Sequence, residues 1–141
     1  MFQVLIGNTD AHAKNLSFFC DAAGYTLSPA YDLLSIPACG QTRLADSYAM
    51  AIGDAFRAQE LSAFEWANFA FTCKLPPALV ARELKKMLTR IQAALPACRA
   101  MAQRAGADEG MVERVCEVVQ SQCARQESIV AQIVRVDQGL F

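Results

Sequence analysis

Residues 8–15 read Asn8-Thr9-Asp10-Ala11-His12-Ala13-Lys14-Asn15 and gather polar chemistry at one place in the sequence. An acid, the only histidine, a lysine and a carboxamide fall within one or two turns of backbone. The same residue types are common in turns and helix caps, so a purely structural polar turn is the simplest alternative interpretation. The segments on either side of this octet therefore decide what it means.

A β-hairpin is predicted directly after the octet. Two runs rich in strand-forming residues, 16–20 and 25–28, are joined by a short turn that contains Gly24, and Pro29 ends the second run. Asp32 follows the hairpin at once. Before the octet, the apolar run 2–6 ends at Gly7 and indicates either the end of a helix or a strand. The hairpin would return the chain so that Asp32 approaches the octet from the other side.

The spacing of Asp10, Asn15 and Asp32 is typical of phosphoryl transfer. Protein kinases carry a catalytic aspartate and a metal-binding asparagine five residues apart in one loop, and a second metal-binding aspartate later in the chain. Carboxylate and amide oxygens are the hard ligands that Mg²⁺ accepts. A transition-metal site formed by Asp10, His12 and Asp32 is a further alternative, although nothing in the spacing favours it.

Residues 7–17 and 24–35 resemble the catalytic loop and the metal-binding segment of the HipA family of serine/threonine kinases, the toxins of bacterial toxin–antitoxin pairs. Residues 49–53 and Trp66 resemble the next segments of that family, and the pattern Asp-x-His-x-x-Asn is also similar to the catalytic loop of phosphatidylinositol kinases. The resemblance is strongest up to about Gly53 and weaker in the helices after it. It implies a protein kinase that transfers phosphate from Mg²⁺-ATP to a protein hydroxyl.

The resemblance implies a role for each polar residue of the site. Asp10 would be the catalytic base, and Asn15 and Asp32 would hold Mg²⁺ and, through it, the nucleotide. His12 and Lys14 would be further catalytic residues near the phosphates, with Lys14 also contacting the nucleotide. The implied cofactors are Mg²⁺ and ATP, and the implied partners are a protein substrate and an antitoxin.

The remaining sequence predicts a mainly α fold, a helical bundle with a small β-hairpin after the catalytic loop, and the resemblance implies that this bundle is like a kinase C-lobe. We expect one domain in which residues 1–59 form the loop, hairpin and metal-binding segment, and residues 60–141 form the bundle. Ser62 and Glu65 form a predicted capping box, and Asp108 is a predicted cap of the last helix. A helix that starts at Pro76-Pro77 is expected to be interrupted at Pro96.

Several side chains are assigned structural roles. Tyr31 and Trp66 are expected in the core. Ser17, Ser28 and Ser35 have no neighbouring base or nucleophile elbow, so we do not expect them to be nucleophiles. The six cysteines have no C-x-x-C spacing and are expected to be small buried hydrophobes in a reducing cytosol.

Bulk composition excludes two classes of partner. With 13 basic and 14 acidic residues the formal charge is −1, so we expect no direct nucleic-acid binding and no binding to anionic membranes. No apolar run is long enough to span a bilayer and no signal peptide is evident, so the chain is predicted to be soluble and cytoplasmic.

The sequence contains no recognisable nucleotide cradle. No two of its seven glycines have the spacing of G-x-G-x-x-G or a Walker loop, and no lysine precedes Lys14. In the HipA family these parts belong to an N-terminal lobe, so we expect a truncated kinase that lacks this lobe and is inactive alone. The alternative is a non-enzymatic interaction module, a decayed or split toxin fragment that binds an antitoxin or a complementary lobe.

Overall fold

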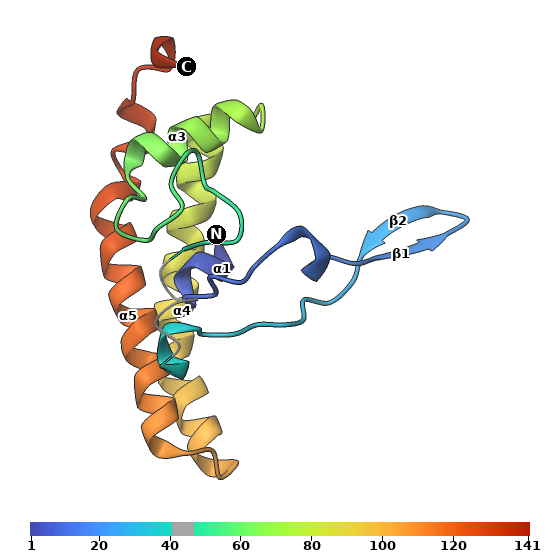
Figure 1. The fold of residues 1–141 in the computed structure, drawn as a ribbon, viewed down its shortest axis with the longest axis vertical. Helices are drawn as coiled ribbons and strands as arrows, with labels where there is room; N and C mark the ends of the chain where they lie inside the picture. Colours follow the sequence, from blue (N-terminus) through green and yellow to red (C-terminus); the bar gives the residue numbers. More distant parts are fainter. Residues whose placement is uncertain (41–46) are drawn as a thin grey trace.

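The chain forms a mainly helical structure, seen here in a computed structural model that describes residues 1–40 and 47–141 (Figure 1). The elements that carry the fold are, in order, α1 (Phe2–Leu5), β1 (Phe18–Asp21), β2 (Gly24–Leu27), α3 (Ala63–Thr72), α4 (Pro77–Arg104) and α5 (Glu109–Val130). Short 3₁₀ turns cover Ala13–Asn15, Pro37–Cys39, Ile133–Arg135 and Gln138–Leu140. The predicted fold class, helices with one small hairpin after the loop, is confirmed, whereas the division at residue 60 stays a prediction.

Helices α4 and α5 form a long antiparallel pair that makes the body of the molecule (Figure 1). The predicted cap of α5 is present, because the Asp108 side chain accepts a 2.7 Å hydrogen bond from the Met111 amide. The capping box of α3 is only half formed. Ser62 accepts from the Glu65 amide, but the Glu65 carboxylate accepts a 2.6 Å bond from the Asp54 amide and does not turn back to Ser62.

The predicted interruption at Pro96 is wrong, because α4 continues through this residue to Arg104. A proline in a helix removes one hydrogen bond and crowds the carbonyl four residues earlier. Beyond Pro96, α4 still packs along α5, where Arg99 forms an ion pair with Glu113, and this packing makes continuing the helix favourable despite that cost. Pro96 itself is exposed, so the carbonyl group that loses its partner can be hydrated.

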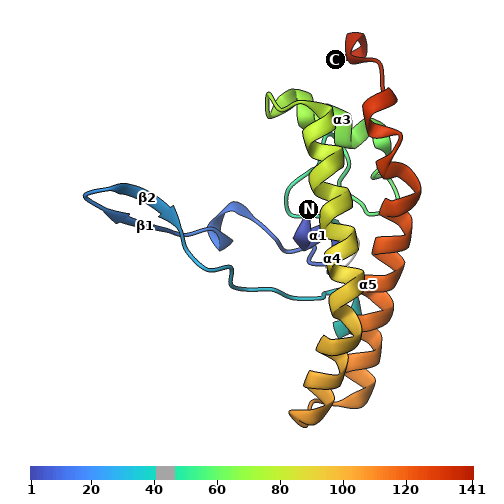
Figure 2. The same ribbon diagram turned by 180° about the vertical axis from the view of Figure 1, so that it is seen from behind.

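The hairpin β1–β2 projects away from the helical body in both views (Figure 1, Figure 2). Its antiparallel register pairs Phe18 with Leu27 and Cys20 with Tyr25, which confirms the predicted hairpin. All four of these side chains are exposed. Since paired residues share one face of a sheet, the hairpin carries a solvent-exposed apolar face, which we call the hairpin face: Phe18, Cys20, Tyr25 and Leu27.

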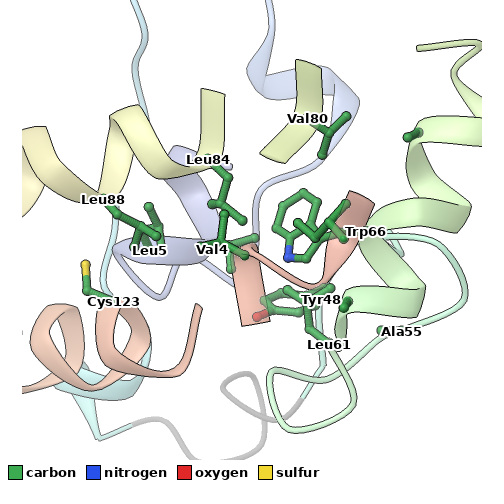
Figure 3. Packing of buried hydrophobic residues seen from close by; sticks show 14 of the residues in the cluster. Val4, Leu5, Tyr48, Ala55, Leu61, Trp66, Val80, Leu84, Leu88 and Cys123 are labelled. Carbon is green, nitrogen blue, oxygen red and sulfur yellow. The ribbon is translucent and has the colours of Figure 1, made fainter. Parts of the chain in front are cut away.

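The core lies where α1, α3, α4 and α5 meet, around Trp66 (Figure 3). Trp66 is 1 % exposed, and its indole Nε1 donates a 2.7 Å hydrogen bond to Oε1 of the buried Gln126. Its predicted place in the core is confirmed, but Tyr31 is 43 % exposed and that prediction is wrong. The burial predicted for the cysteines holds for Cys116 and Cys123 and fails for the exposed ones, Cys20, Cys39, Cys73 and Cys98.

The exposure of Tyr31 and Cys20 follows from their position. They lie on the extended segment and the hairpin that leave the helical body, away from the core around Trp66. Among the described residues, no helix combines the length and the apolar character that crossing a bilayer requires.

Candidate functional site

The end of α1 sets the starting position of the predicted catalytic loop. Gly7 has φ +72°, and the amides of Gly7 and Asn8 donate to the carbonyls of Val4 and Gln3. This pair of bonds is a Schellman motif, in which a left-handed residue ends the helix and satisfies its last carbonyls. The sequence left open a helix or a strand before Gly7, and the structure shows a helix. Asn8 therefore leaves α1 in a fixed direction.

The side chain of Asn8 connects both halves of the site, although it is only 2 % exposed. Its Nδ2 donates to Oε1 of Gln3 at 2.9 Å and to the main-chain oxygen of Asp32 at 2.8 Å. Its Oδ1 accepts from the amide of Asp10 at 3.2 Å. One carboxamide thus touches the backbone of two predicted site residues.

Asn15 and Asp32 are brought together as the sequence predicts. The Nδ2 of Asn15 donates a 2.8 Å hydrogen bond to Oδ2 of Asp32 and lies 3.4 Å from the main-chain oxygen of Asp10. The 3₁₀ turn Ala13–Asn15 turns the chain so that Asn15 faces back toward Asp10. Asp32 is exposed and has φ +54°, a backbone region that a non-glycine residue rarely adopts.

Tyr31 joins the segment before Asp32 to the turn that carries Lys14. Its hydroxyl donates to the main-chain oxygen of Lys14 at 2.9 Å and lies 2.9 Å from Oγ of Ser17. Farther along, the amide of Ile36 donates to the carbonyl of Gly7 at 3.2 Å, so the chain returns to the point where it left α1. The predicted metal-binding segment is therefore tied to the loop at Tyr31 and, directly after its end, at Ile36.

The other predicted site residues are less constrained. The Asp10 carboxylate is exposed and forms no hydrogen bond with a described residue. Lys14 is exposed, and its ammonium forms no ion pair within the described part of the chain. His12 is half-buried, and its Nδ1 is buried without a partner among the described residues. The structure therefore does not bring His12 or Lys14 into hydrogen-bonding contact with Asp10 or Asp32.

The donor set of the site fits Mg²⁺ held jointly with phosphates. Asp32 and Asn15 supply hard oxygens, and their mutual hydrogen bond uses Oδ2 of Asp32 and Nδ2 of Asn15, so Oδ1 of each remains without a partner among described residues. Mg²⁺ is commonly bound by one or two protein oxygens together with waters and substrate phosphates. By contrast, no group of three histidine, cysteine, aspartate or glutamate side chains within residues 1–40 and 47–141 could hold a metal, which leaves the transition-metal alternative without support.

Sequence reasoning missed Asn8 and assigned Tyr31 to the core. The hydrogen bond from Asn8 to Asp32 spans 24 positions and the one from Tyr31 to Lys14 spans 17, so neither follows from local spacing. The one local signal was Gly7, because a side chain placed directly after a glycine-capped helix end is held in a defined direction.

The chain is similar to HipA-like proteins in both sequence and fold. The family described as HipA-like C-terminal domain matches residues 1–98. The serine/threonine-protein kinase toxin HipA of Shewanella oneidensis is 36 % identical over 95 residues, which are 67 % of this chain and 22 % of that protein. The putative kinase Y4mE of Sinorhizobium fredii is 35 % identical over 88 residues, or 62 % of this chain and 20 % of that protein.

A solved structure of the Shewanella oneidensis HipA, HipB and operator DNA complex contains a chain that superposes with a TM-score of 0.82 at 28 % identity. The match covers 96 % of this chain and 33 % of that chain. This chain therefore spans about a fifth of the length of the curated relatives. Since the family match extends over well more than half of the chain, the protein belongs to the HipA-like C-terminal domain family.

Proposed function

We propose that this chain carries the catalytic-loop half of a serine/threonine protein kinase site that uses Mg²⁺-ATP. The observation that carries the proposal is the 2.8 Å contact between Asn15 and Asp32, with the Asp10 backbone beside Asn15. In phosphoryl transfer the protein contributes alignment and charge neutralisation. Bound Mg²⁺ would neutralise phosphate charge, and the residues of this chain that would hold it are Asn15 and Asp32.

The three remaining side chains have separate proposed roles. Asp10 accepts the proton of the incoming protein hydroxyl, which is consistent with an exposed carboxylate that forms no hydrogen bond with any described residue. Lys14 is an exposed cation near the site and attracts the phosphates. His12 has an Nδ1 without a partner among the described residues and can donate to a phosphate oxygen, or exchange a hydrogen bond with an ordered water.

The adenine and ribose contacts come from polypeptide outside this sequence, because the 141 residues contain no glycine-rich cradle. We propose that the hairpin face is covered by this nucleotide-binding partner. An isolated two-stranded hairpin is marginal in water, and this one exposes 59 % of Phe18, 80 % of Tyr25 and 57 % of Leu27. An antitoxin is a second proposed partner, supported by the HipA relative that was solved together with HipB.

The test is thermal stabilisation of the chain by Mg²⁺-ATP. A ligand at tenfold excess over its Kd stabilises the folded state by about 1.4 kcal/mol. We expect the stabilisation to require both Mg²⁺ and ATP and to vanish in Asp32→Asn, which tolerates the positive φ better than alanine would. Asp21→Asn removes an exposed carboxylate from the neighbouring hairpin and serves as the matched control. Equal stabilisation of wild type and Asp32→Asn would sink the proposal.

The second candidate is a non-enzymatic interaction module, which the exposed hairpin face favours. The two candidates differ in the same experiment, since a module gives no Mg²⁺-ATP shift in the wild-type chain. We also expect the chain alone to transfer phosphate at a negligible rate because it has no cradle. Robust Asp10-dependent transfer from ATP by the pure chain would overturn that expectation.

A further inference from the structure

Asn8 lies in the candidate site, but neither the motif spacing nor the proposed phosphoryl transfer gives this residue a role. It is one of the few polar side chains that are almost fully buried, at 2 % exposure. Its carboxamide uses both N–H donors and its oxygen, with partners at 2.8, 2.9 and 3.2 Å. A buried amide with every group satisfied is held in a single orientation.

The hydrogen-bond partners of Asn8 determine where the oxygen and the nitrogen of its carboxamide lie. The atom that faces the Asp10 amide must accept, and the atom that faces the Asp32 carbonyl must donate. Only one orientation of the amide meets both requirements. The same side chain therefore cannot turn over without losing its bonds to both site residues.

The bond from Asn8 to Asp32 acts on a strained residue. Asp32 has φ +54°, where side chains with a Cβ are disfavoured, and it is exposed on an extended segment. Such a conformation persists only where neighbours hold it. The Asp32 carbonyl accepts a hydrogen bond from Asn8, and the Asp32 carboxylate accepts one from Asn15. Two asparagines therefore restrain both the backbone and the side chain of Asp32.

The two asparagines differ in what holds them. Asn15 is half-exposed on a short 3₁₀ turn, whereas Asn8 is buried at the end of α1, where its own amide donates to the Gln3 carbonyl at 2.8 Å. Asn8 therefore connects the buried end of α1 to Asp32, whereas Asn15 connects Asp32 to a partly exposed turn.

We propose that Asn8 is the positioning residue of the site: it sets the positive φ of Asp32 and the direction of the Asp10 amide, and so fixes the relation between the base and the metal ligand before ligands bind. The proposal rests on the proposed function for its catalytic meaning, since Asp10 and Asp32 matter chemically only if the site transfers phosphate. Groups that orient a metal ligand commonly change metal affinity about 10- to 100-fold when they are removed.

The first measurement uses the wild-type chain without ligand. Nuclear magnetic resonance should show a scalar coupling across the hydrogen bond from Asn8 Nδ2 to the Asp32 carbonyl carbon. It should also show the strong cross-peak between the amide and Hα protons of Asp32 that a positive φ produces. If the coupling is absent and the Asn8 side-chain amide protons exchange as fast as those of exposed Gln120, the proposal is overturned.

The second measurement compares Asn8→Asp with Gln3→Met. Asn8→Asp keeps the size of the side chain but places an oxygen against the Asp32 carbonyl, and Gln3→Met removes another partner of Asn8 while leaving the bond to Asp32. We expect Asn8→Asp to lose the positive-φ signature and to weaken Mn²⁺-ATP binding, measured by electron paramagnetic resonance, by at least about tenfold. Gln3→Met should keep the signature and stay within about twofold of wild type.

The outcomes separate this proposal from the proposed function. If wild type and Asp32→Asn bind Mn²⁺-ATP equally, the proposed function fails, while the ligand-free spectra still decide whether Asn8 sets the Asp32 backbone. If Asp32→Asn loses binding but Asn8→Asp keeps both the signature and the affinity, the site stands and the role of Asn8 is overturned.

Discussion

The side-chain amide of Asn15 donates a 2.8 Å hydrogen bond to Oδ2 of Asp32, 17 positions away and across the whole hairpin. An amide and a carboxylate at this distance form a hydrogen-bonded pair, whereas two carboxylates would repel each other. The pair is therefore stable without a cation. Each of the two side chains still has one oxygen that a cation could bind. A substitution at Asn15 should therefore change the affinity of the site for a divalent cation.

Asn15→Asp should raise the affinity of the site for Mn²⁺ in the absence of nucleotide. The substitution places two carboxylates side by side, and one more negative charge near a partly exposed cation is worth about tenfold in affinity, or ~1.4 kcal/mol. Isothermal titration calorimetry measures the change. The swap Asn15→Asp with Asp32→Asn restores one amide and one carboxylate and should return to the wild-type affinity. A swap variant that kept the raised affinity would show that the two residues do not share a cation.

Gly7→Ala should destabilise the fold by about 2–4 kcal/mol. Gly7 has φ +72°, and an added Cβ would lie 2.7 Å from Cγ1 of Val118 on α5. The matched control is Gly106→Ala, where φ is +79° but the added Cβ meets no atom within 4 Å, so only the backbone term of about 1 kcal/mol applies. Urea unfolding of both variants separates the two contributions. Equal losses would mean that the close approach of the loop to α5 contributes nothing.

Trp66→Phe should cost about 2–4 kcal/mol, and much of that cost should come from Gln126. Within the described part of the chain, the substitution removes the one partner of Gln126 Oε1, and Nε2 of the same amide is already unpaired there. Adding Gln126→Met to Trp66→Phe should recover about 1–2 kcal/mol, since replacing both members of a buried polar pair is far less costly than orphaning one. A double variant no more stable than Trp66→Phe would contradict this account.

Pro96→Ala should stabilise the chain by about 1–3 kcal/mol, because α4 is continuous and alanine restores the missing donor. Pro77→Ala is the control, since Pro77 is the first residue of the same helix, where the absent N–H has no intrahelical acceptor. Chemical denaturation should therefore show a gain at 96 and little change at 77. Loss of stability in Pro96→Ala would mean that α4 depends on a bend at this position.

The contrast between Pro96 and the hairpin explains how far the sequence could predict this structure. The hairpin and the return of Asp32 follow from local turn chemistry, and the Asp108 cap needs only the residues beside it, so these predictions were correct. The interruption predicted at Pro96 was wrong because α4 keeps packing along α5 beyond this residue, and these long-range contacts outweigh one local signal.

In the candidate site, too, local spacing predicted some residues, whereas a long-range contact determined another. The spacing of Asp10, Asn15 and Asp32 identified residues that the fold brings near one another. The residue that joins the loop to the return segment, Asn8, could not be found in this way. Its importance comes from a hydrogen bond across 24 positions, which exists only once α1 and the hairpin are both in place.

Tyr48→Phe should remove a pH dependence of stability that the wild type shows at alkaline pH. Burial raises the pKa of Tyr48 from 10.0 to about 12, although the nearby Arg125 charge acts in the opposite direction. Between pH 10 and 12 the unfolded chain loses the phenol proton while the folded chain keeps it. The contribution of the protonated Tyr48 phenol to the free energy of unfolding is therefore complete below pH 10, and it is lost as the pH rises toward 12.

The expected size of this effect is about 1–2 kcal/mol in the difference between wild type and Tyr48→Phe from pH 9 to pH 12, measured by urea unfolding. Cys116 and Cys123, whose pKa values burial also raises, titrate in both proteins and cancel in the difference. Tyr25→Phe is the control, since it removes the same hydroxyl group from a side chain that is 80 % exposed. Near pH 7 the Tyr48 hydroxyl has no partner among described residues, so Tyr48→Phe should cost little there. A Tyr48→Phe curve parallel to wild type through pH 12 would show that the phenol titrates alike in the folded and unfolded chains.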